Sequence, residues 1–162
     1  MSGGRILVAG VGNVFLGDDG FGPAVLARLA GQPLPDGVRA VDYGIRGVHL
    51  CYDLLDGWDV LVLVDALPGD GPPGELRLLE VTDADLAGAP ALDGHGLHPL
   101  AVLSSLRTLG GQLPRTRVLG CTPASVDEGM GLSAEVQAAV QPAAHRVRAL
   151  LAGLAVPAAG GS

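Results

Sequence analysis

The stretch "RILVAGVGNVFLGDDGFGPAVLARLAG", residues 5–31, shows how the fold begins. Residues 5–11 form an apolar run of strand length, which is typical of a strand buried on both faces. A helical pattern follows over residues 22–31, and a glycine-rich turn joins the two. Such a turn usually binds phosphate, but this one carries two adjacent carboxylates, Asp18 and Asp19. The role of these two charges has to be inferred from the rest of the chain.

Strand and helix patterns alternate along the remaining sequence. Further strands are predicted at 38–44, 59–66, 74–81 and 116–121, and further helices at 48–56, 98–109 and about 133–153. The alternation within 74–81 is only partial, which indicates an edge strand. This order predicts a three-layer α/β sandwich, in which a twisted, mostly parallel five-stranded sheet has helices on both faces.

The helical patterns carry their own signals. Apolar residues stand at helical spacing in two of them: Val48, Tyr52 and Leu55 in the first, and Leu100, Leu103 and Leu106 in the second. Ser133 is placed to cap the last helix, and Pro142 should kink or break it. We expect a single domain over residues 1–156 and a disordered tail at 157–162.

Composition restricts the function. The chain has 162 residues and a net charge of −7, so phosphates of a nucleic acid would be repelled. The N-terminal apolar run is too short for a signal peptide, and no run approaches a membrane span. Cys51 and Cys121 form no CxxC pair, and Cys121 reads as a buried thiol more readily than as a nucleophile. We expect a cytoplasmic monomer that binds neither nucleic acid nor membrane.

Polar residues collect where strands end. Asp19 follows the first strand, Asp65 ends the third, and His95 lies in a glycine-flanked turn before a helix. The carboxyl ends of parallel strands share one edge of the sheet, so these three segments can meet there. Two carboxylates and one imidazole make a credible site for a divalent metal ion.

Each of these residues also has a structural interpretation. Asp18 can cap a helix. Asp65 follows a strongly apolar strand, so it must be hydrogen-bonded, bound to a metal or close to solvent. Asp42 mimics the ribose-binding acid of a dinucleotide fold, but Phe15 stands where GxGxxG needs its third glycine. The sequence contains neither a P-loop nor a GxSxG elbow.

Taken together, these motifs resemble those of the hydrogenase maturation proteases over nearly the whole chain. The matching segments are "ILVAGVGNVFLGDDGFG", "DYGIRG", "LVLVDA", "HGLHPLAVLSSL" and "GCTPASVDEGMGLS". The resemblance implies that Asp19, Asp65 and His95 are metal ligands and that Asp18 supports them or caps a helix. Many relatives have glutamate at the position of Asp19. The turn after the second strand differs too, and Asp42 within it is a candidate substrate-binding residue.

The resemblance also implies a reaction. It predicts an endopeptidase that removes the C-terminal extension of a nickel-loaded [NiFe]-hydrogenase large-subunit precursor, using the precursor's nickel for recognition and no organic cofactor. Asp19 or Asp65 could serve as the general base of an aspartyl-type protease, or the nickel could activate water itself. Two alternatives stay open at this point: a zinc-dependent hydrolase of a small substrate, and a non-catalytic nickel chaperone or dinucleotide-binding module.

Overall fold

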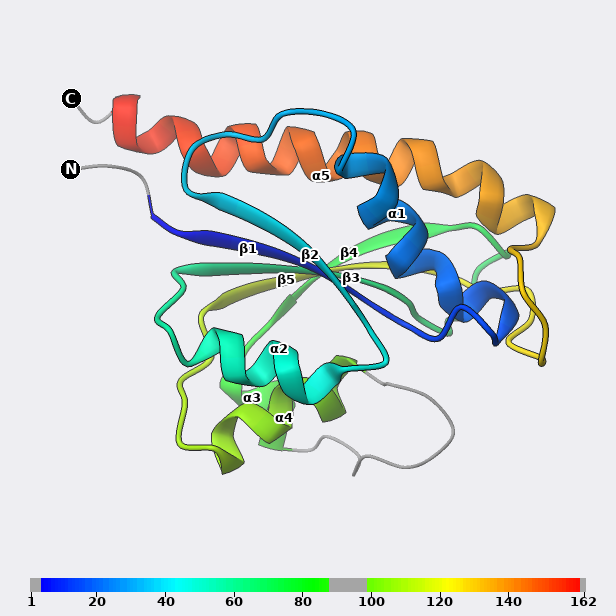
Figure 1. The fold of residues 1–162 in the computed structure, drawn as a ribbon, viewed down its shortest axis with the longest axis horizontal. Helices are drawn as coiled ribbons and strands as arrows, with labels where there is room; N and C mark the ends of the chain where they lie inside the picture. Colours follow the sequence, from blue (N-terminus) through cyan, green and yellow to red (C-terminus); the bar gives the residue numbers. More distant parts are fainter. Residues whose placement is uncertain (1–3, 88–98, 161–162) are drawn as a thin grey trace.

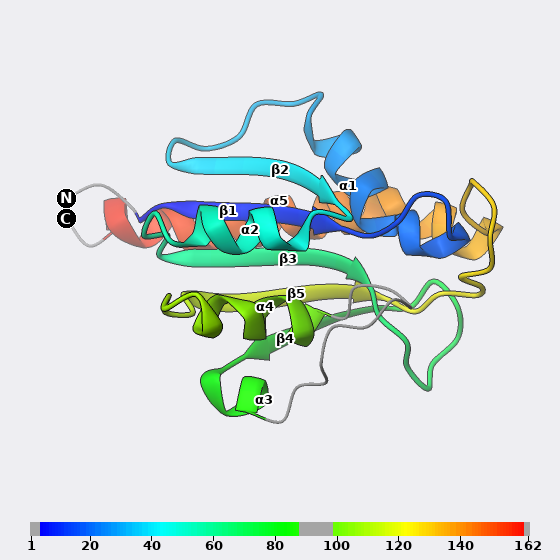
Figure 2. The same cartoon turned by 60° about the horizontal axis from the view of Figure 1, so that its bottom comes forward.

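The fold is known from a computed structural model that describes residues 4–87 and 99–160. Five strands form one sheet in the order β2-β1-β3-β5-β4, as Figure 2 shows. They are β1 (Ile6–Val11), β2 (Val38–Gly44), β3 (Val60–Ala66), β4 (Leu76–Val81) and β5 (Arg115–Cys121). All neighbouring pairs are parallel except β4 and β5. The predicted mostly parallel sheet is confirmed, and β4 lies at an edge as its partial alternation indicated.

Helices cover both faces of this sheet, which confirms the three-layer sandwich (Figure 1). The helices are α1 (Phe21–Leu29), α2 (Gly47–Leu54), α3 (Asp83–Ala87), α4 (Pro99–Thr108) and α5 (Ala134–Gly160), and a 3-10 turn η1 (Gly17–Gly20) precedes α1. α1 and α5 pack on one face, and α2, α3 and α4 pack on the other. The sequence did not predict η1 and α3, because each is too short to show a helical period.

The central strand β3 explains why two separate cores form. Its side chains alternate between the two faces, so Val62 and Val64 join the core under α1 and α5, whereas Leu61 and Leu63 join the core under α2 and α4. All four side chains are fully buried. By the same alternation Asp65, the next residue after Val64, lies on the face covered by α2 and α4.

Helix α2 forms as predicted, but it buries a different face. The residues at helical spacing, Val48, Tyr52 and Leu55, are 49%, 55% and 42% exposed. The buried residues are Leu50, Cys51 and Leu54. Because α2 is apolar on two sides, helical spacing alone could not show which side meets the sheet.

Helix α5 differs from its prediction in length and continuity. Ser133 caps it as expected, since its Oγ accepts a hydrogen bond from the backbone N–H of Val136 at 3.3 Å. The predicted break at Pro142 is wrong: the helix continues through this exposed residue, because packing of the opposite face on the core outweighs one lost hydrogen bond. Its assigned end at Gly160 overlaps the segment 157–162, whose disorder stays a prediction. No helix in the described part of the chain could span a membrane.

Candidate active site

The candidate site lies at the carboxyl edge of the sheet, around the end of β3. There Val64 pairs with Gly10 of β1 and with Leu119 of β5, and Asp65 lies opposite Gly120 of β5. The turn that carries Asp18 and Asp19 follows β1 directly, so both segments reach the same edge, as the parallel sheet predicted. Asp65 therefore lies between two neighbouring strands with the acidic turn beside it.

Asp65 is a buried carboxylate that has no hydrogen-bond partner among the described residues. It is 0% exposed, and neither carboxylate oxygen has a hydrogen-bond partner in the described structure. Burial raises its pKa well above the ordinary value of 3.8, and the negative charge of Asp19 raises the pKa further. The backbone N–H of Ala66 offsets part of this increase, although its geometry falls outside that of a hydrogen bond. Such a group needs either a proton or a cation to compensate its charge.

Asp19 is half-buried beside Asp65. Its Oδ2 accepts a hydrogen bond of 2.7 Å from the backbone N–H of Asn13. Burial raises the pKa of Asp19, and this one hydrogen bond offsets only part of the increase. The site therefore combines two carboxylates whose charges disfavour each other, which is an arrangement that a cation or a shared proton would stabilise.

Asp18 has the opposite surroundings, although it is only 1% exposed. Its carboxylate accepts hydrogen bonds from the backbone N–H groups of Ala124, Ser125 and Ser133 at 2.8, 3.1 and 2.7 Å, and from the Ser133 hydroxyl at 2.9 Å. Burial by itself would raise the pKa of Asp18, but these hydrogen bonds outweigh it and lower the pKa. The predicted capping of the following helix is wrong, since neither η1 nor α1 has a side-chain cap hydrogen bond. Asp18 instead ties the acidic turn to the loop before α5.

Asn13 and two glycines shape the acidic turn, and sequence reasoning did not single them out. The side chain of Asn13 accepts a hydrogen bond from the N–H of Phe15 at 2.9 Å, a local pattern that favours asparagine. Gly12 has a φ of +144°, and a methyl group there would collide with the backbone carbonyl of Asp19. A methyl group on Gly22 would collide with carbonyl oxygens at the ends of β1 and β3. Glycine thus allows α1 to begin directly over the site.

The end of β2 holds Asp42 away from Asp65. Asp42 is exposed, and its Oδ1 accepts a hydrogen bond of 2.9 Å from the N–H of Gly44. β1 separates it from β3, so about 10 Å lies between the two strands. Tyr43 is buried and donates its hydroxyl to Asp53 of α2 at 2.6 Å. Tyr43 is therefore part of the core, whereas Asp42 faces solvent at this end of the sheet edge.

The third predicted ligand is His95. His95 lies outside the described residues, and α4 begins four residues after it, at Pro99. Within residues 4–87 and 99–160, no three side chains of His, Cys, Asp or Glu gather closely enough to hold a metal ion. The described part of the site contributes two candidate ligands, Asp19 and Asp65, and the three-ligand set stays a prediction.

Neither cysteine has the surroundings of a nucleophile. Both are buried and free. Cys121 pairs with Ala66 in the sheet, and burial, together with the charge of Asp18, raises its pKa to about 11. Burial likewise raises the pKa of Cys51 to about 11, and its thiol donates to the carbonyl oxygen of Val102. The prediction of a buried thiol at Cys121 is confirmed.

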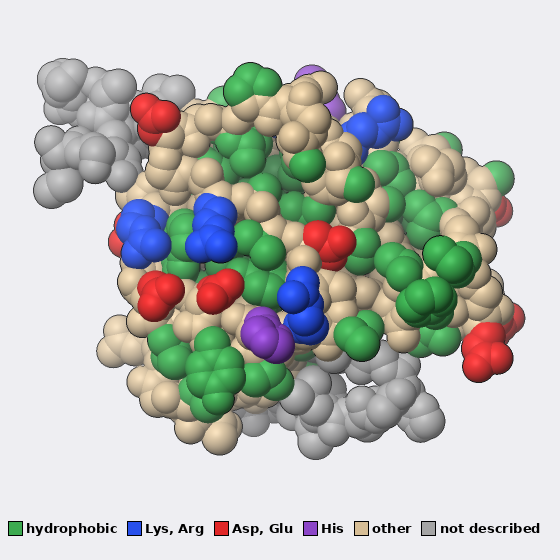
Figure 3. All heavy atoms as spheres, in the orientation of Figure 1, with side chains coloured by type: hydrophobic (Ala, Val, Ile, Leu, Met, Phe, Trp, Pro, Cys, Tyr) green, Lys and Arg blue, Asp and Glu red, His purple; other side chains and the backbone are tan. Residues whose placement is uncertain are grey.

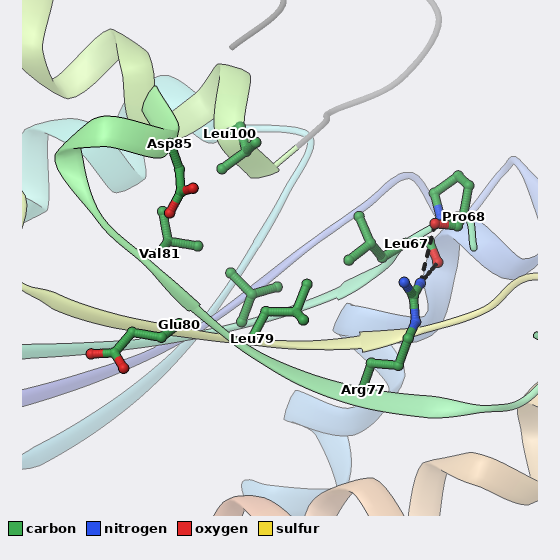
Figure 4. A pocket seen from close by; sticks show the side chains of 9 residues that line it. Leu67, Pro68, Arg77, Leu79, Glu80, Val81, Asp85 and Leu100 are labelled. Carbon is green, nitrogen blue, oxygen red and sulfur yellow. Dashed lines mark hydrogen bonds between the residues drawn. The ribbon is translucent and has the colours of Figure 1, made fainter. Parts of the chain in front are cut away.

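A pocket of about 400 Å³ opens near the site on the sheet face that carries Asp65 (Figure 4). Its wall includes Leu67 and Pro68, which follow β3, and Leu100 of α4. The guanidinium of Arg77 donates to the carbonyl oxygens of Leu67 and Pro68 at 2.5 and 3.1 Å. Arg77 therefore fixes the segment that leaves the site.

The fold and these side chains define a class of enzyme. A buried carboxylate at the carboxyl edge of a parallel sheet, with no partner in the part of the chain that is described, indicates a carboxylate-based site. The acidic turn does not suit a nucleotide phosphate. The family model described as "Hydrogenase maturation protease" matches residues 23–149.

Individual relatives agree with this match. The chain is 32% identical to the hydrogenase 2 maturation protease of Escherichia coli over 149 residues, covering 91% of this chain and 90% of the relative. It is 33% identical to a putative hydrogenase maturation protease of Methanocaldococcus jannaschii, covering 85% and 90%. The solved structure of the hydrogenase maturating endopeptidase HybD from E. coli superimposes with a TM-score of 0.75 at 32% identity, covering 92% and 93%. The chain therefore belongs to the hydrogenase maturation protease family and is a hydrolase, an endopeptidase of hydrogenase maturation.

Proposed function

We propose that this endopeptidase removes the C-terminal extension of a nickel-loaded [NiFe]-hydrogenase large-subunit precursor and recognises the precursor through its nickel ion. In this proposal Asp19, Asp65 and His95 approach the nickel, and Asp42 contacts the substrate. The nickel arrives as part of the substrate, and no organic cofactor takes part. The reaction takes place in the cytoplasm, with the chain acting as a monomer.

The observation that carries the proposal is that Asp65 is buried with no hydrogen-bond partner among residues 4–87 and 99–160. Enclosing a carboxylate without hydrogen bonds costs several kcal/mol if the group is charged, so the free protein holds it more stably with a proton. A divalent cation can replace that proton and compensate the charge. Two carboxylates and one imidazole bind nickel weakly on their own, but they can complete the coordination of an ion that thiolates already hold.

This donor set also explains why only loaded precursor would be cut. Without nickel, the negative charges of Asp19 and Asp65 disfavour each other, and no cation holds the precursor at these two side chains. With nickel, the precursor's C-terminal segment is drawn to the end of β3. Binding energy from the metal then positions the scissile bond, which is where proximity lowers the activation barrier.

The hydrolysis itself needs a base for the attacking water. Asp19 and Asp65 both have raised pKa values, so each is a stronger base than an ordinary carboxylate. One of them takes a proton from water, the hydroxide adds to the carbonyl carbon, and the C–N bond breaks as the amine receives a proton. The nickel serves to position the peptide, and either Asp19 or Asp65 can act as the base.

The test is the intact mass of the large-subunit precursor from the same organism, co-expressed with this chain with and without nickel in the medium. The proposal predicts loss of a C-terminal peptide only when both nickel and this chain are present. An unchanged mass in a precursor shown to contain nickel would overturn it. Cleavage of nickel-free precursor at the same rate would overturn the recognition step alone. Stoichiometric zinc in the isolated protein would favour a zinc hydrolase instead.

A further inference from the structure

Two loops at the carboxyl edge of the sheet are joined into one unit. One is the turn at residues 13–17, and the other is the loop at 122–133 before α5. The backbone N–H of Gly17 donates to the carbonyl oxygen of Gly129, whose own N–H donates to Phe15, both at 2.8 Å. Asp18, which directly follows the first loop, anchors the second loop by accepting hydrogen bonds from the backbone N–H groups of Ala124 and Ser133. We call this unit the double-loop rim.

The double-loop rim presents apolar side chains to solvent. Val14 and Phe15 of the first loop are 39% and 62% exposed, and Val126 and Met130 of the second are 47% and 73% exposed. A hollow of about 300 Å³ lies between the loops, with Met130 in its wall. Figure 3 shows hydrophobic side chains gathered at the right-hand end of the view, where Figure 1 places the two loops. The backbone hydrogen bonds between the two loops hold this apolar group in place, which reduces the ordering that binding requires.

The charge of the rim has one sign. Asp127 and Glu128 are exposed and also line the hollow. The sequence has no lysine or arginine between residues 12 and 27 or between residues 122 and 145. The rim therefore combines exposed apolar area with uncompensated negative charge, and a second copy of this chain or an anionic membrane would be repelled by it.

The rim is also continuous with the candidate site. Asp19 follows the first loop within η1, and the N–H of Asn13 in that loop donates to its carboxylate. A polypeptide whose scissile bond lies at Asp19 and Asp65 can therefore extend over the rim on one side. The negative charge and the exposed apolar side chains of the rim then determine which side chains of that polypeptide can bind there.

We propose that the double-loop rim binds the protein substrate beside the scissile bond and takes an apolar segment that carries basic side chains. The inference rests on the proposed function, and it adds the chemistry of the segment and the residues that select it. Phe15 and Met130 contact the apolar part, and Asp127 and Glu128 attract the basic part. None of these four residues takes part in the chemical step.

The apolar half is tested with Phe15→Ser and Met130→Ser, singly and together, against nickel-loaded large-subunit precursor. Initial cleavage rates over a range of precursor concentrations separate KM from kcat. The double variant is expected to raise KM about 10-fold or more and to leave kcat within about twofold, since only binding is weakened. The matched control is Tyr52→Ser on α2, where a side chain of similar exposure (55%) lies away from the rim.

The charged half is tested with Asp127→Lys and Glu128→Lys, and with Asp36→Lys as control, since Asp36 is exposed in the loop between α1 and β2. The rim variants should raise KM several-fold at low salt, and the difference from wild type should shrink at high salt. Wild-type kinetics in all rim variants would overturn the inference while leaving the proposed function intact. If wild-type protein cleaves no nickel-loaded precursor, the proposed function fails and the inference fails with it.

Discussion

Two buried carboxylates at one edge of the sheet, Asp18 and Asp65, have nearly the same exposure and opposite surroundings. Asp18 accepts four hydrogen bonds from Ala124, Ser125 and Ser133, and its pKa is lowered. Asp65 accepts none from the described residues, and its pKa is raised. Burial alone thus says little about the role of a carboxylate, whereas the presence or absence of partners separates a structural group from a reactive one.

Asp18 and Asp65 therefore have different roles. Asp18 compensates the cost of its burial within the protein, so its removal should damage the fold. The charge of Asp65 is not compensated within the described structure, so its removal should damage function and spare the fold. Adjacent Asp19 lies between these extremes, with one hydrogen bond and partial exposure.

The largest expected effect is on activity. Asp65→Asn should lower the rate of precursor cleavage about 1,000-fold, because an amide keeps the shape but loses the charge that faces the substrate. Its stability in urea should equal or exceed that of wild type, since burial disfavours ionisation of the Asp65 carboxyl and an amide does not ionise. Asp36→Asn is the control. If the variant cleaves normally, Asp65 is not needed for activity. If it unfolds, Asp65 is needed for the fold.

The next effect is on stability. Asp18→Ala leaves three backbone N–H groups unpaired, so it should lower the free energy of unfolding by about 3 kcal/mol. Urea unfolding of the variant beside wild type measures this difference, with Asp36→Ala as the exposed control. A loss below about 0.5 kcal/mol would mean that Asp18 does not anchor the two loops.

The two carboxylates should also respond to pH in opposite directions. Asp65 has a folded pKa above 3.8, so its contribution to stability is complete below that pH and is lost as pH rises through the folded pKa. Asp18 has a folded pKa below 3.8, so its contribution is present above that pH and is lost as pH falls through the folded pKa. Each can change the free energy of unfolding by at most about 1.4 kcal/mol per pH unit.

Difference curves isolate these contributions from all other groups. Relative to wild type, Asp65→Asn should gain stability as pH rises above about 4. The disadvantage of Asp18→Asn should shrink as pH falls below about 4. Urea unfolding at a series of pH values gives both curves. Parallel curves for wild type and Asp65→Asn would show that Asp65 titrates normally.

The smallest expected effect concerns Ser133, whose hydroxyl donates a hydrogen bond to Asp18. Ser133→Ala removes the hydroxyl that donates to Asp18 and accepts from Val136, so a loss of about 1 kcal/mol is expected, typical of a lost helix cap. The backbone N–H of Ser133 still binds Asp18 in this variant. A loss in urea unfolding as large as that of Asp18→Ala would show that the hydroxyl, and not the backbone amides, anchors the carboxylate.

Sequence patterns predict the parts of this fold that obey a local period. Strands such as β1 and β3 are apolar on both faces because helices cover both, so continuous apolar runs identify them. Parallel strands also bring Asp19 and Asp65 to one edge without further information. The α2 helix shows the limit of such patterns, because Tyr52 and Leu50 are equally acceptable as core residues until the sheet is in place.

The partners of Asp18 could not be predicted in the same way. Ser125 and Ser133 lie more than 100 residues further along the chain, and no local pattern encodes a contact at that distance. That Asp65 finds no partner among the described residues is equally non-local, since it depends on how several neighbouring elements are placed. Sequence therefore indicated which carboxylates matter, and the structure was needed to tell the anchoring one from the unpartnered one.

The most direct test of the central claim is nickel K-edge X-ray absorption of the loaded precursor, frozen before cleavage, alone and mixed with the protease. The account predicts additional oxygen and nitrogen ligands on the nickel with wild-type protein and fewer with Asp65→Asn. Identical spectra with and without wild-type protein, at concentrations where the two are bound, would contradict the claim that Asp65 faces the metal of the substrate.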